Sequence, residues 1–181
     1  ALVGPPGSGT AEQAARLSAK FGAILVSADE LVETAVAHGT ELGAKAKVYK
    51  ETDAPVPDEI ICQLVLDRLL GEDCRRHGWL LEGFPRTSAQ AMALEEKGVH
   101  VRELLVLELA DAAAVDAITS RRIDPVNGRA YRLGALPADA PEGLEARLVQ
   151  HPRDTREVAE RRLKIWNDGK AGLVEQCALR L

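Results

Sequence analysis

Aromatic side chains are scarce in this sequence: they make up 3% of the 181 residues, whereas hydrophobic residues make up 46%. The core must therefore be built from aliphatic side chains, and a chain of this length can bury one substantial core. No apolar run approaches the ~20 residues that a membrane-spanning helix needs, and the first residues show no signal-peptide pattern. We therefore expect a single cytoplasmic domain, 1–181, with no membrane partner.

Cysteines and basic clusters are also few. Cys62, Cys74 and Cys177 lie far apart and form no C-x-x-C pair, which argues against a disulfide framework and predicts no zinc. The net charge is -5 and no basic cluster stands out, which argues against nucleic acid as the main partner. Because Ala1 falls partway through an expected strand, we also expect the domain to be part of a longer chain.

The segment that begins at Gly4 has the glycine spacing of a phosphate-binding loop but lacks its lysine. Such a loop reads G-x-x-x-x-G-K-[ST]: backbone N–H groups cradle phosphates, the lysine reaches the terminal ones and the hydroxyl attends the metal. Gly4 and Gly9 have this spacing, Leu2-Val3 resembles a strand end, and residues 11–21 are expected to form a helix. The lysine position holds Thr10.

Strands and helices are expected to alternate along the rest of the chain. The continuous apolar runs at 23–26, 79–81 and 104–107 are typical of strands buried on both faces of a parallel sheet. Pro57 is expected at the first position of one helix, and Asp111 is expected to cap another. This alternation predicts an α/β fold with helices on both sides of the sheet, and ligands of such sheets lie at the carboxyl ends of the strands.

Residues 123–152 interrupt the alternation because they are rich in Pro, Gly, Ala and Asp. Asn127-Gly128 lies between short strand-like pieces and predicts a hairpin with a two-residue turn. We expect a small flap between two helices. The second of these, near 154–168, carries Leu163 and Trp166 on one face, where Trp166 is interpreted as core packing.

Four pieces of the chain together resemble the adenylate kinase family of nucleoside monophosphate kinases. They are the loop at Gly4, the string Glu82–Thr87, the segments Arg121–Pro125 and Gly128–Tyr131, and the closing helix with Arg162-Leu163. The resemblance implies a P-loop NTPase-type three-layer sandwich with a parallel sheet, whose parts are a core (1–27, 78–122 and 153–181), a helical NMP-binding subdomain (28–77) and a lid (123–152).

The resemblance also implies a reaction, ATP + AMP = 2 ADP with Mg²⁺, which depends on positioning and electrostatic stabilisation of the moving phosphoryl group. Arg86 matches the arginine that clamps the acceptor phosphate, and Arg121 and Arg162 match further phosphate-contacting arginines. Glu82 stands where the family has an aspartate near the metal, and Gln90 matches the residue that reads the acceptor adenine. The remaining nucleotide-binding positions are Gly4, Gly7, Ser8, Gly9, Thr10 and Gly83. For Arg86 the alternative is a structural ion pair with Glu82 or another carboxylate.

Several other positions depart from the family pattern. Glu12 and Ala28 stand where the family has threonines, and Glu33, Ala117 and His151 stand where it has arginines. Loss of one preorganised donor typically costs ~10²–10³ in rate, and Glu12 and Glu33 would place negative charge near phosphate oxygens. We therefore expect inefficient phosphotransfer.

The first turn after the loop also fits a capping box. In Thr10-Ala11-Glu12-Gln13 the Thr10 hydroxyl and the Gln13 side chain could satisfy the free N–H groups at the helix start, while Glu12 complements the helix dipole. A bound phosphate would satisfy the same groups. The hypothesis is that this helix caps itself and no longer depends on an anion.

Two functions follow from these observations. The first is a weak or inactive pseudokinase with a structural, scaffolding role in a larger assembly. Its partners would be other domains or subunits of that assembly. Its ligands, where binding is retained, would be adenine nucleotides, including ATP with Mg²⁺. The string that begins at Arg121 resembles adenylate-kinase-like domains of multi-domain proteins of the cilium and flagellar axoneme. The alternative is an active nucleoside monophosphate kinase.

Overall fold

The computed structural model describes residues 1–52 and 54–178, which divide into two compact units. The first unit contains Ala1–Gly4, Gly9–Leu107 and the residues from Asp168 on. The second contains Pro5–Ser8 and Glu108–Asn167. The predicted division into core, NMP-binding subdomain and lid stays a prediction.

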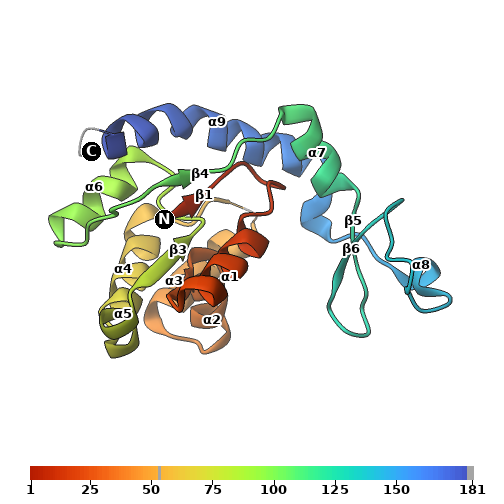
Figure 1. Ribbon diagram of the computed structural model, residues 1–181, viewed down its shortest axis with the longest axis horizontal. Helices are drawn as coiled ribbons and strands as arrows, with labels where there is room; N and C mark the ends of the chain where they lie inside the picture. Colours follow the sequence, from red (N-terminus) through yellow and green to blue (C-terminus); the bar gives the residue numbers. More distant parts are fainter. Residues whose placement is uncertain (53, 179–181) are drawn as a thin grey trace. The chain divides into compact units, whose positions relative to one another are not determined.

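The first unit is built on a parallel sheet. Its strands are β1 (Leu2–Val3), β2 (Ile24–Ser27), β3 (Trp79–Glu82) and β4 (Leu105–Val106), in the order β2-β3-β1-β4. Figure 1 labels β1, β3 and β4 in the part of the molecule that also contains α1, α4 and α6. Ser27 on β2 and Leu2 on β1 both pair with Glu82 on β3, so three strands end at the same edge. The α/β class and the parallel sheet are therefore confirmed.

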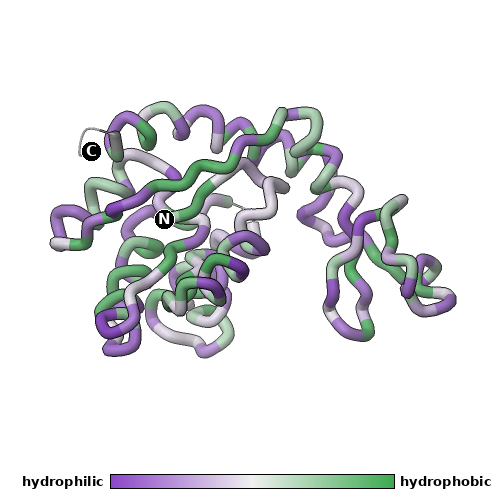
Figure 2. The backbone as a smooth tube through the Cα atoms, viewed as in Figure 1, coloured by the Kyte–Doolittle hydropathy of each residue, from purple (hydrophilic) through white to green (hydrophobic). Residues whose placement is uncertain are grey.

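The core of this unit is mainly aliphatic, as the scarcity of aromatics predicts. Val26, Leu81 and Leu94 are almost completely buried, together with Phe84. Figure 2 shows the hydrophobic colour along the strands of this sheet. Cys62 is a free thiol in the same cluster. Its burial raises its pKa to about 11, so it remains a neutral thiol at ordinary pH.

The last strand differs from the prediction. The run 104–107 was expected to be buried on both faces, yet Leu105 is 47% exposed. β4 is at the end of the order among the described strands, so a neighbouring strand covers it on one side only. Continuous apolar residues predict a strand here correctly but do not give its place in the sheet.

The helices of the first unit follow the predicted alternation. They are α1 (Thr10–Phe21), α2 (Ala28–Ala37), α3 (Glu41–Glu51), α4 (Asp58–Leu69), α5 (Glu72–His77) and α6 (Ser88–Glu96). Pro57 is the residue before the helix α4 rather than its first helical residue, so that prediction is wrong by one position. α2 and α3 pack so closely that a Cβ at Gly43 would lie 1.9 Å from the carbonyl oxygen of Ala35.

The second unit contains α7 (Asp111–Thr119), β5 (Arg121–Ile123), β6 (Ala130–Arg132), α8 (Leu144–Arg147) and the beginning of α9 (Arg156–Ala178). Asp111 is the first helical residue and Ala110 precedes it as the cap position, so the predicted capping role is wrong. The acidic side chain still lies in the first turn, where it favours the helix dipole. Trp166 is buried, which confirms its interpretation as core packing.

The predicted hairpin is present, but its turn is longer than predicted. β5 and β6 pair antiparallel, with Arg122 opposite Tyr131, and residues 124–129 connect them. The Asp124 carboxylate accepts a hydrogen bond from the Val126 N–H (3.0 Å), and the Gly128 N–H donates to the Asp124 carbonyl (2.8 Å). The acidic side chain therefore organises a wider loop than the Asn-Gly pair alone would form.

Candidate functional site

The backbone of the glycine-rich loop lies close to α7. Gly7 has φ +85°, and a Cβ on it would lie 2.9 Å from the carbonyl oxygen of Ala114 on α7. The Ser8 N–H donates to the Pro5 carbonyl (3.1 Å), while Ser8 Oγ is buried without a hydrogen-bond partner in the part of the chain that the structure describes. Gly4 directly follows β1. Such a buried orphan hydroxyl is compatible with a loop built to hold a ligand oxygen.

The self-capping hypothesis is wrong. Gly9, at φ +79°, is the cap residue of α1, and no described side chain bonds to the free N–H groups there. The left-handed Gly9 makes Thr10 the first helical residue, so the Thr10 hydroxyl points elsewhere and donates to Glu82 Oε1 at 2.7 Å. Glu12 instead pairs with Arg16 on the exposed surface of the helix (2.6 Å). An uncapped helix N-terminus fits phosphate oxygens.

Glu82 is the centre of a small polar cluster at the strand ends. It is 8% exposed, and its second oxygen, Oε2, accepts a hydrogen bond from Ser27 Oγ (2.9 Å). One carboxylate and two hydroxyl oxygens are ligands that Mg²⁺ accepts, so these three side chains fit the metal that the family uses. No group of three or more His, Cys, Asp and Glu side chains suited to a metal occurs among the described residues, and Glu82 as a Mg²⁺ contact stays a prediction.

Arg86 is held by the chain itself. Its Nε donates to the Gly83 carbonyl (2.5 Å) and its Nη2 donates to Asp29 Oδ2 (2.9 Å). Gly83 has φ +70°, and a Cβ there would lie 3.0 Å from Arg86 Nη2. Arg86 thus forms an ion pair with Asp29, which was the structural alternative for this residue. Its role in clamping the acceptor phosphate stays a prediction.

Gln90 is equally engaged. It is buried, its Oε1 accepts a hydrogen bond from the Arg86 N–H (2.7 Å), and its Nε2 donates to Asp58 Oδ1 (2.6 Å). Thr87 caps the same helix, α6, by accepting from the Gln90 N–H. Both ends of the Gln90 amide have protein partners, so reading a base would require an exchange of hydrogen bonds.

The other two predicted arginines belong to the second unit. Arg121 makes two hydrogen bonds to the carboxylate of Asp154 (2.8 and 3.1 Å), whose side chain is only 2% exposed. Arg162 is partly buried on α9. His151, at a predicted arginine position, accepts a hydrogen bond at Nδ1 from the Arg153 N–H (3.1 Å) and so caps a short 3₁₀ turn.

The ion pair of Asp124 with Arg147 was not predicted from the sequence. Arg147 donates through Nε (3.0 Å) and Nη2 (2.7 Å) to the fully buried Asp124 carboxylate. The Arg147 hydrogen bond lowers the pKa of Asp124, and the same bond raises the pKa of Arg147. An acidic residue directly before a Pro-x-Asn-Gly turn was the available signal, although nothing local indicates its partner.

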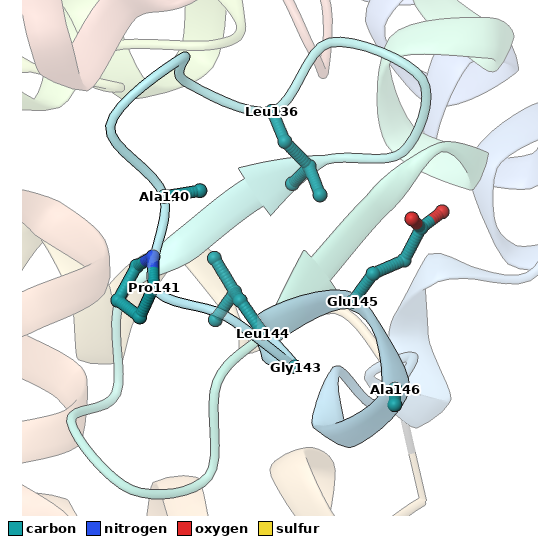
Figure 3. A pocket seen from close by; sticks show the side chains of 7 residues that line it. All are labelled: Leu136, Ala140, Pro141, Gly143, Leu144, Glu145 and Ala146. Carbon is teal, nitrogen blue, oxygen red and sulfur yellow. The ribbon is translucent and has the colours of Figure 1, made fainter.

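Surface hollows occur among the described residues of both units. The hollow in the second unit, of about 570 Å³, is drawn in Figure 3 and contains no predicted site residue; it is lined by Leu136, Ala140, Pro141, Gly143, Leu144, Glu145 and Ala146. The hollow in the first unit, of about 310 Å³, lies between α2 and α3 and includes Glu33. Glu33, which stands where the family has an arginine, pairs there with Lys50 (2.9 Å). Its negative charge therefore already has a cationic partner.

A parallel sheet of this order, with a glycine-rich loop joining β1 to α1, defines a P-loop nucleotide-binding fold. The family model described as adenylate kinase matches residues 2–177, and the chain belongs to the adenylate kinase family. Members of this family use ATP and Mg²⁺. No helix within the described residues is long and apolar enough to cross a membrane.

Three curated relatives illustrate the similarity. The chain is 37% identical over 163 residues to "Probable adenylate kinase 2, chloroplastic" of Oryza sativa subsp. japonica. These residues are 90% of the chain and 56% of the relative. It is 36% identical to "Adenylate kinase, chloroplastic" of Zea mays, over 91% of the chain and 74% of the relative. It is 34% identical to "Adenylate kinase 8" of Xenopus laevis, over 92% of the chain and 34% of the relative. The chain thus spans between about a third and three quarters of the length of these relatives.

Proposed function

We propose that this chain is an adenylate-kinase-like domain that binds adenine nucleotides weakly and transfers phosphoryl groups far more slowly than ordinary kinases do. The observation that carries the proposal is the position of Thr10. It replaces the lysine of the phosphate-binding loop, and its hydroxyl is bonded to Glu82 rather than exposed to the loop. Because phosphoryl transfer depends on positioned positive charge, a hydroxyl committed to a carboxylate cannot replace the ammonium group.

The state of the remaining site residues supports the same proposal. Arg86 is paired with Asp29 and Arg121 with Asp154, so each guanidinium already has an anionic partner. Glu33 stands at a position where the family has an arginine, and its carboxylate is paired with Lys50. Charge-stabilising groups act through preorganisation, and here several of them are organised around the protein's own carboxylates.

For the biological role we propose scaffolding inside a larger protein, with other domains or subunits as partners. The support is that "Adenylate kinase 8" of Xenopus laevis contains about three times the length matched by this chain, so a domain of this kind occurs within a longer relative. The resemblance of the string that begins at Arg121 to ciliary adenylate-kinase-like domains makes a ciliary axoneme the setting to examine first. A structural domain needs its fold intact rather than its phosphate site.

The second candidate function is an active nucleoside monophosphate kinase. It is favoured by one specific observation, the uncapped N-terminus of α1 after a loop with left-handed Gly7 and Gly9. That geometry presents free N–H groups to an anion. The three relatives also carry the name adenylate kinase.

A coupled assay of ADP formation from ATP and AMP separates the two functions. We expect the wild-type domain to turn over well below the ~1–100 s⁻¹ of ordinary kinases, and we expect Thr10→Lys to raise ATP-Mg²⁺ affinity in a titration. Turnover within that range, abolished by Arg86→Ala but not by the control Arg76→Ala, would overturn the proposal. Arg76 is a suitable control because it is exposed and pairs only with Glu72 on α5 among the interactions of the described residues.

A further inference from the structure

Asp29 is the residue in contact with the guanidinium that is expected to hold the acceptor phosphate. Its Oδ2 accepts a hydrogen bond from Arg86 Nη2 at 2.9 Å. We propose that Asp29 determines specificity at the acceptor site, by occupying the anion position on Arg86 and thereby weakening the binding of a nucleoside monophosphate relative to the free nucleoside. This inference rests on the proposed function, because it takes Arg86 as the acceptor-phosphate group.

The backbone fixes the orientation of Arg86 before any ligand arrives. Arg86 Nε donates to the Gly83 carbonyl (2.5 Å), and the missing side chain at Gly83 leaves room for Nη2. An arginine recognises phosphate best with two parallel N–H groups. Since Asp29 takes one of these groups, an arriving phosphate must displace the carboxylate or bind with fewer hydrogen bonds.

The pairing of the strands explains why Asp29 lies beside Arg86. Ser27 at the end of β2 is opposite Glu82 at the end of β3, and their side chains are also hydrogen-bonded. The chain continues from these two residues directly into the first turn of α2, which contains Asp29, and into the Gly83–Arg86 segment. The contact is therefore positioned by the paired ends of β2 and β3.

We expect Asp29 to affect phosphate binding through electrostatic repulsion and to contribute little to the stability of the fold. The side chains of Arg86 and Asp29 are 42% and 63% exposed, and exposed ion pairs are weak, so a ligand can break this one. The carboxylate would nevertheless remain within a few ångströms of the phosphate, well inside the Debye length of about 8 Å at physiological salt. Repulsion of a phosphate dianion at such a distance corresponds to roughly a tenfold loss of affinity.

A purely structural explanation of Asp29 is also available. An acidic residue in the first turn of a helix favours the helix dipole, and Glu30 lies in the same turn of α2. The two explanations differ in what they predict for ligands. A dipole effect alone changes the stability of α2, whereas occupation of Arg86 changes the preference between a ligand with a phosphate and one without.

The test compares AMP with adenosine by isothermal titration calorimetry on the whole chain. We expect Asp29→Asn to bind AMP about tenfold more tightly than wild type, with adenosine affinity unchanged. Glu30→Gln is the matched control and should leave both affinities unchanged. In Asp29→Asn combined with Arg86→Ala, the gain for AMP should disappear, since the carboxylate acts through that guanidinium.

An unchanged ratio of AMP to adenosine affinity in Asp29→Asn would overturn the proposal, as would an equal gain for both ligands or a gain that survives Arg86→Ala. Absence of AMP binding by Asp29→Asn at millimolar concentration would overturn it too. The proposed function is judged separately, by turnover in the coupled assay. A low turnover together with an unchanged affinity ratio therefore contradicts the role of Asp29 alone.

Discussion

The ion pairs of the two units use the same chemical groups in different surroundings. In the first unit, Arg86 pairs with Asp29, whose carboxylate side chain is 63% exposed. In the second unit, the carboxylates of Asp124 and Asp154 are almost completely inaccessible, and each is held by two hydrogen bonds from one arginine. Exposed pairs contribute little to stability, whereas removing one partner of a buried pair leaves a charge without compensation. We therefore expect the first kind of pair to affect ligand binding and the second to support the structure.

The largest effect is expected from breaking a buried pair. Arg121→Ala leaves the Asp154 carboxylate buried without its arginine, and the free energy of unfolding of the second unit should fall by about 3 kcal/mol. The chain has two tryptophans, Trp79 in the first unit and Trp166 in the second. Denaturant unfolding followed by fluorescence in a Trp79→Phe background therefore reports on the second unit.

The matched control for this experiment is Arg132→Ala. Arg132 also lies in the second unit and pairs with Asp116, but both side chains are more than half exposed. Its removal should cost less than about 1 kcal/mol. Equal losses for the two variants would show that burial does not distinguish these ion pairs.

The pH dependence of the second unit should carry the signature of Asp124. The pKa of Asp124 is lowered in the folded state. The ionised carboxylate therefore contributes fully to the free energy of unfolding above the unfolded-state pKa of about 3.9, and this contribution is lost as the pH falls through the lower folded-state pKa. We expect the stability difference between wild type and Asp124→Asn to be constant from pH 7 to 5 and to shrink below pH 4. Urea unfolding at a series of pH values measures this stability difference. A difference that does not change with pH would contradict the role given to the Asp124 carboxylate.

The smallest change in stability is expected for the exposed pair. Asp29→Asn should alter the free energy of unfolding of the first unit by less than about 1 kcal/mol, measured by Trp79 fluorescence in a Trp166→Phe background. A loss as large as that of Arg121→Ala would mean that Asp29 is a structural residue, and the contrast between the units would fail.

Much of the fold could be predicted from local patterns. Continuous apolar runs located the strands β2 and β3, and the glycine spacing after Leu2-Val3 located the loop that joins β1 to α1. These features depend on a few neighbouring residues, so the sequence displays them directly. The Asn-Gly pair likewise predicted the hairpin, while the length of its turn depended on Asp124, whose side chain bonds determine the loop.

The site was harder to predict, because its contacts join residues that are far apart in sequence. Thr10 bonds to Glu82 and Asp29 bonds to Arg86, and no local pattern encodes such partners. The capping box failed for a more local reason. The left-handed Gly9 starts the helix one residue earlier than the box requires, so Thr10 is helical and its hydroxyl reaches β3.

The absent side chain of Gly43 has a consequence for which sequences this domain can tolerate. A methyl group at this position would lie 1.9 Å from the carbonyl oxygen of Ala35, so any other residue would push α2 away from α3. α2 also carries Asp29 and Glu33, and both would shift with it. The absent side chain on α3 thus helps to keep Asp29 at its hydrogen-bonding distance from Arg86, and a substitution at Gly43 would alter the charges around Arg86 without changing any charged residue.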